Sequence, residues 1–258
     1  MEFITLGRTN LLVSRTSFGA MSLDCKEIQA FGDLADEKAC AIVHQAYDAG
    51  INFFDTSHTK VACERRLGAA LHGIRQNVMI ATKSAATDVE ELCIDLTESL
   101  QALESDTIDL YQLENPKVLP LQDDPLYKKL LKFKETGQVK HIGLAADDFE
   151  IAKEAVECGL YETLQFPFSM ISGQAVQDLV ADCEKREIGF IASQPLNGGV
   201  VSNIPLAFGF FSQFENVVPV WGAHTQEELG QILYFVSHPP VIDEQFKAEV
   251  ENARMFFN

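Results

Sequence analysis

The sequence predicts a (β/α)8 TIM barrel that forms a single domain over residues 1–258, preceded by a short N-terminal β-hairpin. Short apolar runs rich in Val, Ile and Phe alternate with stretches of helical period, which is the pattern of βα units around a parallel sheet. The alternation counts to eight, and barrels of this class typically contain roughly 250 residues. No linker-like segment interrupts the chain, so we expect one hydrophobic core.

Each expected strand is a short run rich in β-branched or aromatic residues. The eight runs lie at 16–19, 51–54, 78–82, 108–113, 139–144, 163–166, 189–193 and 217–221. Ahead of them, two further short runs flank a turn at 7–10, and we expect this hairpin to plug the bottom of the barrel.

Capping residues mark the starts of several expected helices. Asp36 is expected as the N-cap of the helix that precedes the second strand. Thr87 with Glu90, and Thr225 with Glu228, have the spacing of a capping box. These signals place helices between the strands, as the barrel requires.

The acidic composition limits the possible partners. The chain has 20 Lys and Arg against 38 Asp and Glu, a formal net charge of −18. This charge repels phosphate backbones and anionic lipids, so we expect neither nucleic acid nor a membrane as partner. No stretch approaches the roughly 20 apolar residues needed to cross a bilayer, and the N-terminus lacks a signal-peptide pattern. The sequence predicts a cytoplasmic protein.

The six cysteines and six histidines are scattered along the chain. No C-x-x-C pair occurs, and no two histidines have the i, i+4 spacing of a helical metal site. We therefore expect no protein-ligated metal.

Four polar residues follow or end strands, where chemistry lies in barrels of this class. Asp55 follows the second strand, Lys60 lies in the loop after it, Lys83 ends the third strand and Glu114 ends the fourth. Asp55 and Lys83 lie on neighbouring strands, so we expect a salt bridge between them, either catalytic or simply an inherited buried ion pair. Glu114 must face the barrel mouth, because burial elsewhere would be costly, and we expect it to pair with Lys60 or Lys83.

Several segments together carry a resemblance to a known family. In chain order they read LGRTNLLVS at 6–14, FGAM at 18–21, DAGINFFDT at 48–56, ATK at 81–83, DLYQL at 109–113, GQVKHIG at 137–143 and PL at 195–196. Over essentially its whole length the chain resembles the aldo-keto reductase family. The resemblance implies a (β/α)8 barrel and an oxidoreductase that reduces a small carbonyl substrate with NADP(H) or NAD(H).

The family's catalytic tetrad consists of Asp, Tyr, Lys and His, with tyrosine as the proton donor. Carried over by position, Asp55 and Lys83 are retained, whereas Lys60 replaces the tyrosine and Glu114 replaces the histidine. The resemblance therefore implies a family member whose usual activity is weak or lost.

The cofactor positions are altered in the same way. The resemblance assigns cofactor contacts to Gln165, Ser193, Gly222 and Thr225, but Ser193 stands where an aromatic ring stacks on the nicotinamide. Alanines at 145–146 replace a Ser-Asn pair that holds the nicotinamide amide. No Arg or Lys between 222 and 236 is available for a 2′-phosphate, so NADPH is expected to bind poorly. The N-terminus of the helix at Thr225 still offers N–H groups to a phosphate.

Three functions remain open. The first is an oxidoreductase in which Glu114 or Lys60 replaces tyrosine as the proton donor. The second is a non-catalytic barrel that binds a nucleotide or a protein partner. The third is Schiff-base chemistry, in which Lys60 or Lys83 loses a proton and Glu114 shuttles protons.

Residues 241–257 resemble the last helix of a ferredoxin-linked bacterial branch of the family. In that branch a cysteine-rich iron–sulfur segment follows this helix. The resemblance leaves two alternatives, an iron–sulfur segment or protein partner beyond the C-terminus, or the loss of that segment.

Overall fold

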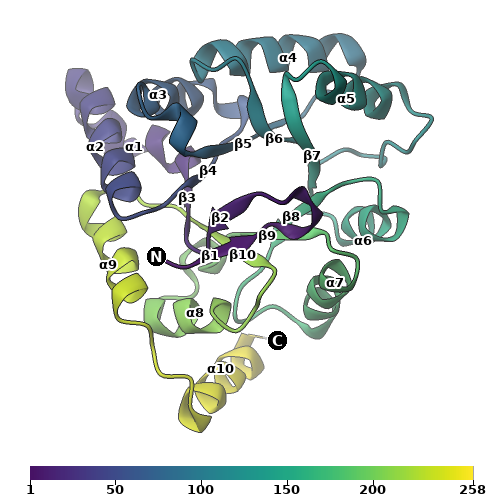
Figure 1. The fold of residues 1–258 in the computed structure, drawn as a ribbon. Helices are drawn as coiled ribbons and strands as arrows, with labels where there is room; N and C mark the ends of the chain where they lie inside the picture. Colours follow the sequence, from purple (N-terminus) through teal and green to yellow (C-terminus); the bar gives the residue numbers. More distant parts are fainter. Residues whose placement is uncertain (258) are drawn as a thin grey trace.

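A closed barrel of eight parallel strands forms the centre of the protein (Figure 1). The computed structural model describes residues 1–257, and Asn258 lies outside the described residues. In order around the barrel the strands are β3 (Ser17–Gly19), β4 (Phe53–Asp55), β5 (Met79–Ser84), β6 (Ile108–Glu114), β7 (Val139–Ala145), β8 (Thr163–Pro167), β9 (Gly189–Ser193) and β10 (Val217–Trp221), which pairs with β3. All eight predicted strands are confirmed, with bounds that differ by at most two residues.

Helices cover the outside of the barrel, as the βα repetition predicts (Figure 1). The α-helices are α1 (Lys26–Gln29), α2 (Ala35–Asp48), α3 (Val61–Leu71), α4 (Val89–Ala102), α5 (Pro125–Glu135), α6 (Phe149–Cys158), α7 (Gln174–Lys185), α8 (Ile204–Phe211), α9 (Gln226–Ser237) and α10 (Glu244–Phe257). Short 3-10 helices are η1 (Gly7–Thr9), η2 (Ala20–Asp24), η3 (Gly32–Leu34), η4 (His58–Lys60), η5 (Arg75–Asn77) and η6 (Asn197–Gly199). None of these described helices is long and apolar enough to cross a membrane.

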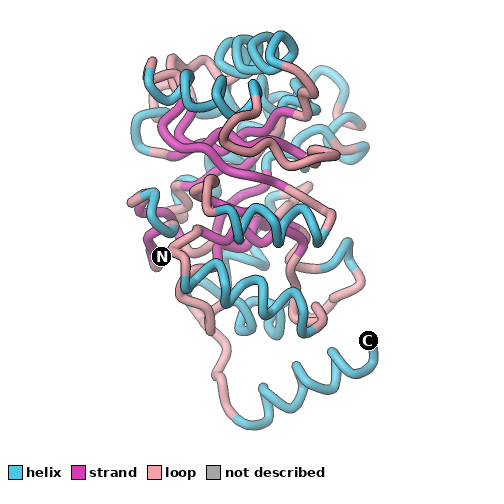
Figure 2. The backbone as a smooth tube through the Cα atoms, turned by 90° about the vertical axis from the view of Figure 1, so that its right-hand side faces the viewer, coloured by secondary structure: helices cyan, strands magenta, loops and turns pink. Residues whose placement is uncertain are grey.

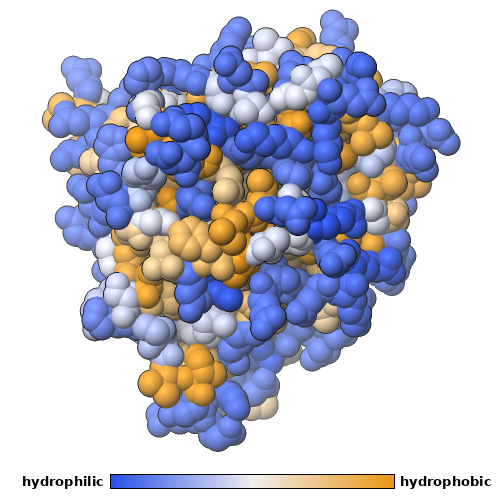
Figure 3. Space-filling model, in the orientation of Figure 1, coloured by the Kyte–Doolittle hydropathy of each residue, from blue (hydrophilic) through white to orange (hydrophobic). Residues whose placement is uncertain are grey.

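The predicted N-terminal hairpin is confirmed as the antiparallel pair β1 (Phe3–Thr5) and β2 (Leu12–Ser14). Leu6 and Val13 are fully buried and belong to an apolar cluster with strand residues of the barrel interior. Gly7 has a φ of +52°, and a Cβ there would lie 2.5 Å from the Glu187 carbonyl oxygen, so the close approach requires glycine. The hairpin thus closes one end of the barrel, in the middle of the face shown in Figure 3.

The apolar core has two parts. The larger cluster lies between the strands and the surrounding helices, and the smaller one fills the barrel interior beside the hairpin. Inside the barrel, polar side chains such as Asp55, Lys83, Gln112 and Gln165 are buried instead. The interior is therefore packed with apolar groups at one end and with polar groups toward the carboxyl ends of the strands.

Two of the predicted helix caps are wrong. Asp36 lies in the first turn of α2, because the 3-10 helix η3 leads directly into it and Leu34 occupies the N-cap position. Asp88, not Thr87, caps α4, since its carboxylate accepts from the first free N–H groups of that helix. Thr225 is confirmed as the N-cap of α9.

The last helix, α10, follows a loop after α9 and packs beside α8 at the edge of the molecule (Figure 2). Phe246 and Val250 form its buried face. A Cβ on Gly209 of α8 would lie 2.6 Å from the Phe246 ring, so the small residue permits this packing. The helix expected over 241–257 is confirmed, beginning at Glu244.

Glu162, which directly precedes β8, is a carboxyl group whose pKa is lowered in the folded protein. Burial alone would raise the pKa of Glu162, but hydrogen bonds from His141, Lys134 and the Ile142 N–H outweigh it and lower the pKa from 4.5 to about 2. A carboxylate with a depressed pKa stabilises the fold above its unfolded-state pKa, and this stabilisation is lost as the pH falls through the folded-state pKa.

We expect Glu162→Gln to lower the free energy of unfolding at pH 7 by roughly 2–3 kcal/mol and to flatten its fall between about pH 4.5 and pH 2. Urea denaturation across this pH range measures both effects. Glu154→Gln, at an exposed position of α6, serves as the control. If the free energy of unfolding fell equally steeply with decreasing pH in Glu162→Gln and in the unmodified protein, the lowered pKa of Glu162 would be contradicted.

Candidate active site

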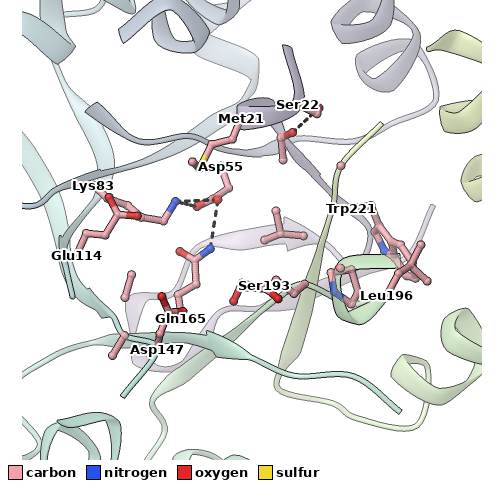
Figure 4. A pocket seen from close by; sticks show the side chains of 18 of the residues that line it. Met21, Ser22, Asp55, Lys83, Glu114, Asp147, Gln165, Ser193, Leu196 and Trp221 are labelled. Carbon is pink, nitrogen blue, oxygen red and sulfur yellow. Dashed lines mark hydrogen bonds and ion pairs between the residues drawn. The ribbon is translucent and has the colours of Figure 1, made fainter. Parts of the chain in front are cut away.

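A cavity of about 460 Å³ opens at the carboxyl ends of the barrel strands (Figure 4). Its walls include most of the site residues predicted from the sequence. Those that line it are Asp55, Lys83, Glu114, Gln165, Ser193 and Gly222. Lys60 and Thr225 lie outside its lining.

Asp55 and Lys83 form the predicted salt bridge. The Lys83 Nζ lies 2.8 Å from each Asp55 carboxylate oxygen and 2.6 Å from the Thr56 carbonyl oxygen. Both side chains are only 4% exposed. A lysine ammonium has three N–H donors, and these three contacts engage them all. Lys83 is therefore saturated within the protein, which leaves no free amine for Schiff-base chemistry.

Buried amides continue the network across the barrel. Gln165 Nε2 donates to Asp55 at 3.2 Å, and Gln165 Oε1 accepts from Gln112 Nε2 at 2.7 Å. Thr163 Oγ1 lies 3.5 Å from Gln112 Oε1. A Cβ on Gly143 would lie 2.1 Å from Thr163 Oγ1, so that glycine makes room for the contact. Gln165 is thus engaged at both ends of its amide.

Glu114 ends β6, is half-buried and faces the cavity. Its carboxylate accepts a hydrogen bond from Ser57 Oγ at 2.6 Å. The expected pairing with Lys60 or Lys83 is wrong, since no such ion pair occurs within residues 1–257. A buried hydroxyl, rather than a cation, satisfies the carboxylate.

Lys60 is the last residue of η4, and its side chain is exposed. Its positive charge contributes to lowering the pKa of Asp24 and opposes the rise that burial causes in the pKa of Cys63. A long ammonium side chain keeps its hydration by remaining at the surface. The structure therefore does not bring Lys60, which the resemblance aligned with the family's tyrosine, into the cavity.

Side chains at the start of α9 accept hydrogen bonds from backbone N–H groups there. Thr225 Oγ1 accepts from the Glu228 N–H at 3.1 Å, and the Glu228 carboxylate accepts from the His224 N–H at 2.8 Å. Glu227 and Glu228 place two negative charges in the first turn. The expected phosphate contact at Thr225 gains no support from this arrangement, because these carboxylates repel an anion.

Trp221 was missed as a site residue by the sequence reasoning. It ends β10, lines the cavity and is only 2% exposed. Its indole Nε1 is buried without a hydrogen-bond partner in the described chain. An unsatisfied buried donor costs about 1–3 kcal/mol. Figure 4 shows Trp221 and Glu114 on opposite sides of the cavity.

Charge around the cavity is negative. With Asp55 and Lys83 paired, the remaining charged lining residues are Glu114 and Asp147. Asp147 is exposed and bonded to Asn115, which donates to its carboxylate at 3.0 Å and accepts from its N–H at 2.7 Å. Among residues 1–257, no group of three or more His, Cys, Asp or Glu side chains could hold a metal ion.

A second depression of about 630 Å³ lies between α8 and α9. Tyr234 and Phe235 supply aromatic surface, and Glu227 supplies the one charge in its described lining. The depression therefore suits a flat uncharged group better than an anion.

Eight parallel strands with a cavity at their carboxyl ends define a (β/α)8 barrel. Comparison with known proteins identifies its family. The family model described as the aldo/keto reductase family matches residues 15–229. The chain belongs to the aldo/keto reductase family.

Two relatives illustrate the sequence likeness. L-galactose dehydrogenase of Arabidopsis thaliana is 27% identical over 219 residues, covering 78% of this chain and 67% of that protein. The uncharacterized oxidoreductase YqkF of Bacillus subtilis (strain 168) is 24% identical over 215 residues, with the same shares covered. The matches thus extend over about two thirds of each relative's length.

Solved structures show the same fold. An aldo-keto reductase from Bacillus halodurans, in its holo form, has a TM-score of 0.82 and 19% identity, with 98% of this chain and 96% of that chain covered. An aldo-keto reductase from Klebsiella pneumoniae, in complex with NADPH, has a TM-score of 0.80 and 18% identity, with 97% and 94% covered.

We expect Asp55→Asn to lower the free energy of unfolding by about 3–5 kcal/mol, because it leaves the Lys83 ammonium buried beside a neutral amide. Urea denaturation at pH 7 measures the change. The double variant Asp55→Asn/Lys83→Met removes both charges and should recover part of the loss. An Asp55→Asn midpoint equal to that of the unmodified protein would show that the pair does not act as a unit.

Proposed function

We propose that the protein binds a reduced nicotinamide dinucleotide and reduces a small carbonyl compound, with Glu114 as the proton donor. One observation carries this proposal. Of the ionisable side chains that line the described cavity, only Glu114 is partly buried and outside the Asp55–Lys83 pair. Asp147 is exposed to solvent and bonded to Asn115.

The proposed reaction needs a hydride and a proton. A reduced nicotinamide held beside Gln165, Ser193 and Gly222 would supply the hydride. Glu114, in its acid form, gives its proton to the carbonyl oxygen, which becomes the alcohol, and is left as a carboxylate. The Ser57 hydroxyl donates to that carboxylate at 2.6 Å and stabilises it.

The residues present fit the dinucleotide loosely. The cavity volume lies within the roughly 300–1,000 Å³ usual for small-molecule sites, and Trp221 supplies part of the apolar wall. Gln165, Ser193 and Gly222 would complete the wall beside the nicotinamide. Alanines at 145–146 and the missing stacking ring each remove about 1–3 kcal/mol of binding free energy.

Turnover is expected to be slow. Lys83 has no free N–H to donate, so it cannot contact the carbonyl oxygen without leaving Asp55 or Thr56. Glu114 alone must therefore supply the general-acid contribution, typically 10²–10⁴-fold.

A second candidate is a barrel that binds the dinucleotide without turnover. It is favoured by the same saturation of Lys83 and by the engagement of Gln165 with Asp55 and Gln112. Binding of NADH without its oxidation, over a panel of reactive aldehydes, would establish this second function.

The cofactor preference follows from the charges of α9. We expect NADH to bind more tightly than NADPH. The family resemblance places the 2′-phosphate near residues 222–236, where no Lys or Arg occurs and where Glu227, in the first turn of α9, would repel it. Glu227→Lys should strengthen NADPH binding by about tenfold and leave NADH binding within threefold, as measured by isothermal titration calorimetry.

Glu154→Lys makes the same charge change on α6, on the opposite side of the barrel (Figure 1), and serves as the control. Equal gains in NADPH affinity from both variants would indicate a general effect of net charge. A dissociation constant for NADPH below that for NADH in the unmodified protein would contradict the preference.

The role of Glu114 is tested by two substitutions. Glu114→Gln retains an acceptor for Ser57 but removes the acid, so NADH oxidation with 4-nitrobenzaldehyde should fall by about 10²-fold or more. Lys60→Tyr should leave the rate within twofold, because position 60 does not line the cavity. Undiminished turnover by Glu114→Gln, or a large gain from Lys60→Tyr, would overturn the assignment.

A further inference from the structure

We infer that Ser57 and Thr59 form a hydroxyl relay that returns protons from solvent to Glu114 through the wall of the barrel. The inference rests on the proposed role of Glu114 as the proton donor. It assigns a function to two residues that lie outside the lining of the cavity.

The relay links the cavity to the surface through two oxygen atoms. Ser57 Oγ lies 2.6 Å from Glu114 Oε2 and 2.8 Å from Thr59 Oγ1. Ser57 is fully buried, Thr59 is exposed, and Glu114 faces the cavity. A continuous chain of hydrogen bonds therefore runs from the carboxylate to the hydroxyl of Thr59, an exposed residue.

The donor and acceptor capacity of the Ser57 hydroxyl determines the direction of its hydrogen bonds to Glu114 and Thr59. Its hydroxyl has one proton and two lone pairs, and an ionised Glu114 can only accept, so Ser57 donates its proton to Glu114. The backbone N–H of Thr59 donates to one Ser57 lone pair, at 3.2 Å. The remaining lone pair must accept from the Thr59 hydroxyl. Both O–H bonds therefore point toward the carboxylate, which is the polarity that delivers a proton to it.

Proton transfer along this chain balances without any co-reactant except water. The Ser57 proton passes to the Glu114 carboxylate, and the Thr59 proton replaces it on Ser57. A water molecule at the surface replaces the proton on Thr59 and is left as hydroxide in the solvent. Each hydroxyl ends neutral, and one proton has moved from solvent to Glu114. A substrate in the cavity would separate the Glu114 carboxylate from the water there. Protons from solvent would then reach Glu114 through Thr59 and Ser57.

A purely structural role for Ser57 must be separated from the relay. Ser57 also caps η4 by accepting from the Thr59 N–H. Thr59→Val removes the hydroxyl but keeps that N–H, so the cap is preserved. Thr59→Ser keeps both groups and is the matched control. The neighbouring His58 is engaged by Asp95 and Glu98 and takes no part in the chain.

Stopped-flow mixing with excess NADH and 4-nitrobenzaldehyde tests the relay during turnover. The first turnover can use a proton that reaches Glu114 through the open cavity before mixing, whereas later turnovers, with substrate in excess, need a new proton through the relay. We expect Thr59→Val to keep the first-turnover rate within twofold, to slow later turnovers at least fivefold and to delay proton uptake recorded by an indicator dye. Thr59→Ser should match the unmodified protein.

The outcomes separate the two proposals. Later turnovers and proton uptake in Thr59→Val equal to those of the unmodified protein would overturn the relay and leave the role of Glu114 intact. A full first turnover by Glu114→Gln would overturn the proton-donor assignment itself.

A second measurement does not depend on activity. In a Glu114→Gln background the amide cannot carry a proton to the cavity, so the Ser57 hydroxyl can exchange with water only through Thr59. Proton NMR should show this exchange at least fivefold slower with Thr59→Val than with Thr59→Ser, and Ser57→Ala identifies the signal. Equal exchange rates would overturn the relay even in a protein that shows no turnover.

Discussion

The Lys83 ammonium and the Asp55 carboxylate lie 2.8 Å apart inside the barrel, where both side chains are almost inaccessible to water. Separating two charges at such a site is costly, because each would remain buried without its partner. The Thr56 carbonyl and the Gln165 amide complete the shell around the pair. Because the pair is closed in this way, it offers no free donor, and contact with a ligand depends on the other residues of the cavity.

Much of the fold could be predicted from local patterns. The eight strands and the hairpin follow from short apolar runs and their turns, and neighbouring strands bring Asp55 and Lys83 together. The caps at Asp36 and Thr87 could not be predicted, because a preceding 3-10 helix or an adjacent aspartate decides which residue takes the cap position. The alternative cap residues lie within one or two positions of each other, so the sequence pattern alone does not separate them.

The site itself was harder to predict, since position along the chain does not give the direction of a side chain. The resemblance aligns Lys60 with the family's tyrosine, yet the short helix η4 leaves Lys60 at the surface, and Ser57 contacts Glu114 instead. Gln112 could have been noticed as a polar residue within an apolar strand, because such a residue needs a buried partner. Nothing in the sequence marks the unsatisfied Trp221 N–H, which arises only when the strands assemble.

The central claim is that Glu114, and not a lysine, contacts the carbonyl oxygen of the substrate. The most direct test is a crystal structure of the protein with NADH and 4-nitrobenzamide, an unreactive counterpart of the aldehyde. We expect the amide oxygen to lie within hydrogen-bond distance of Glu114, while Lys83 keeps its contacts to Asp55 and Thr56. A structure in which Lys83 or Lys60 donates to that oxygen, with Glu114 out of contact, would contradict the account.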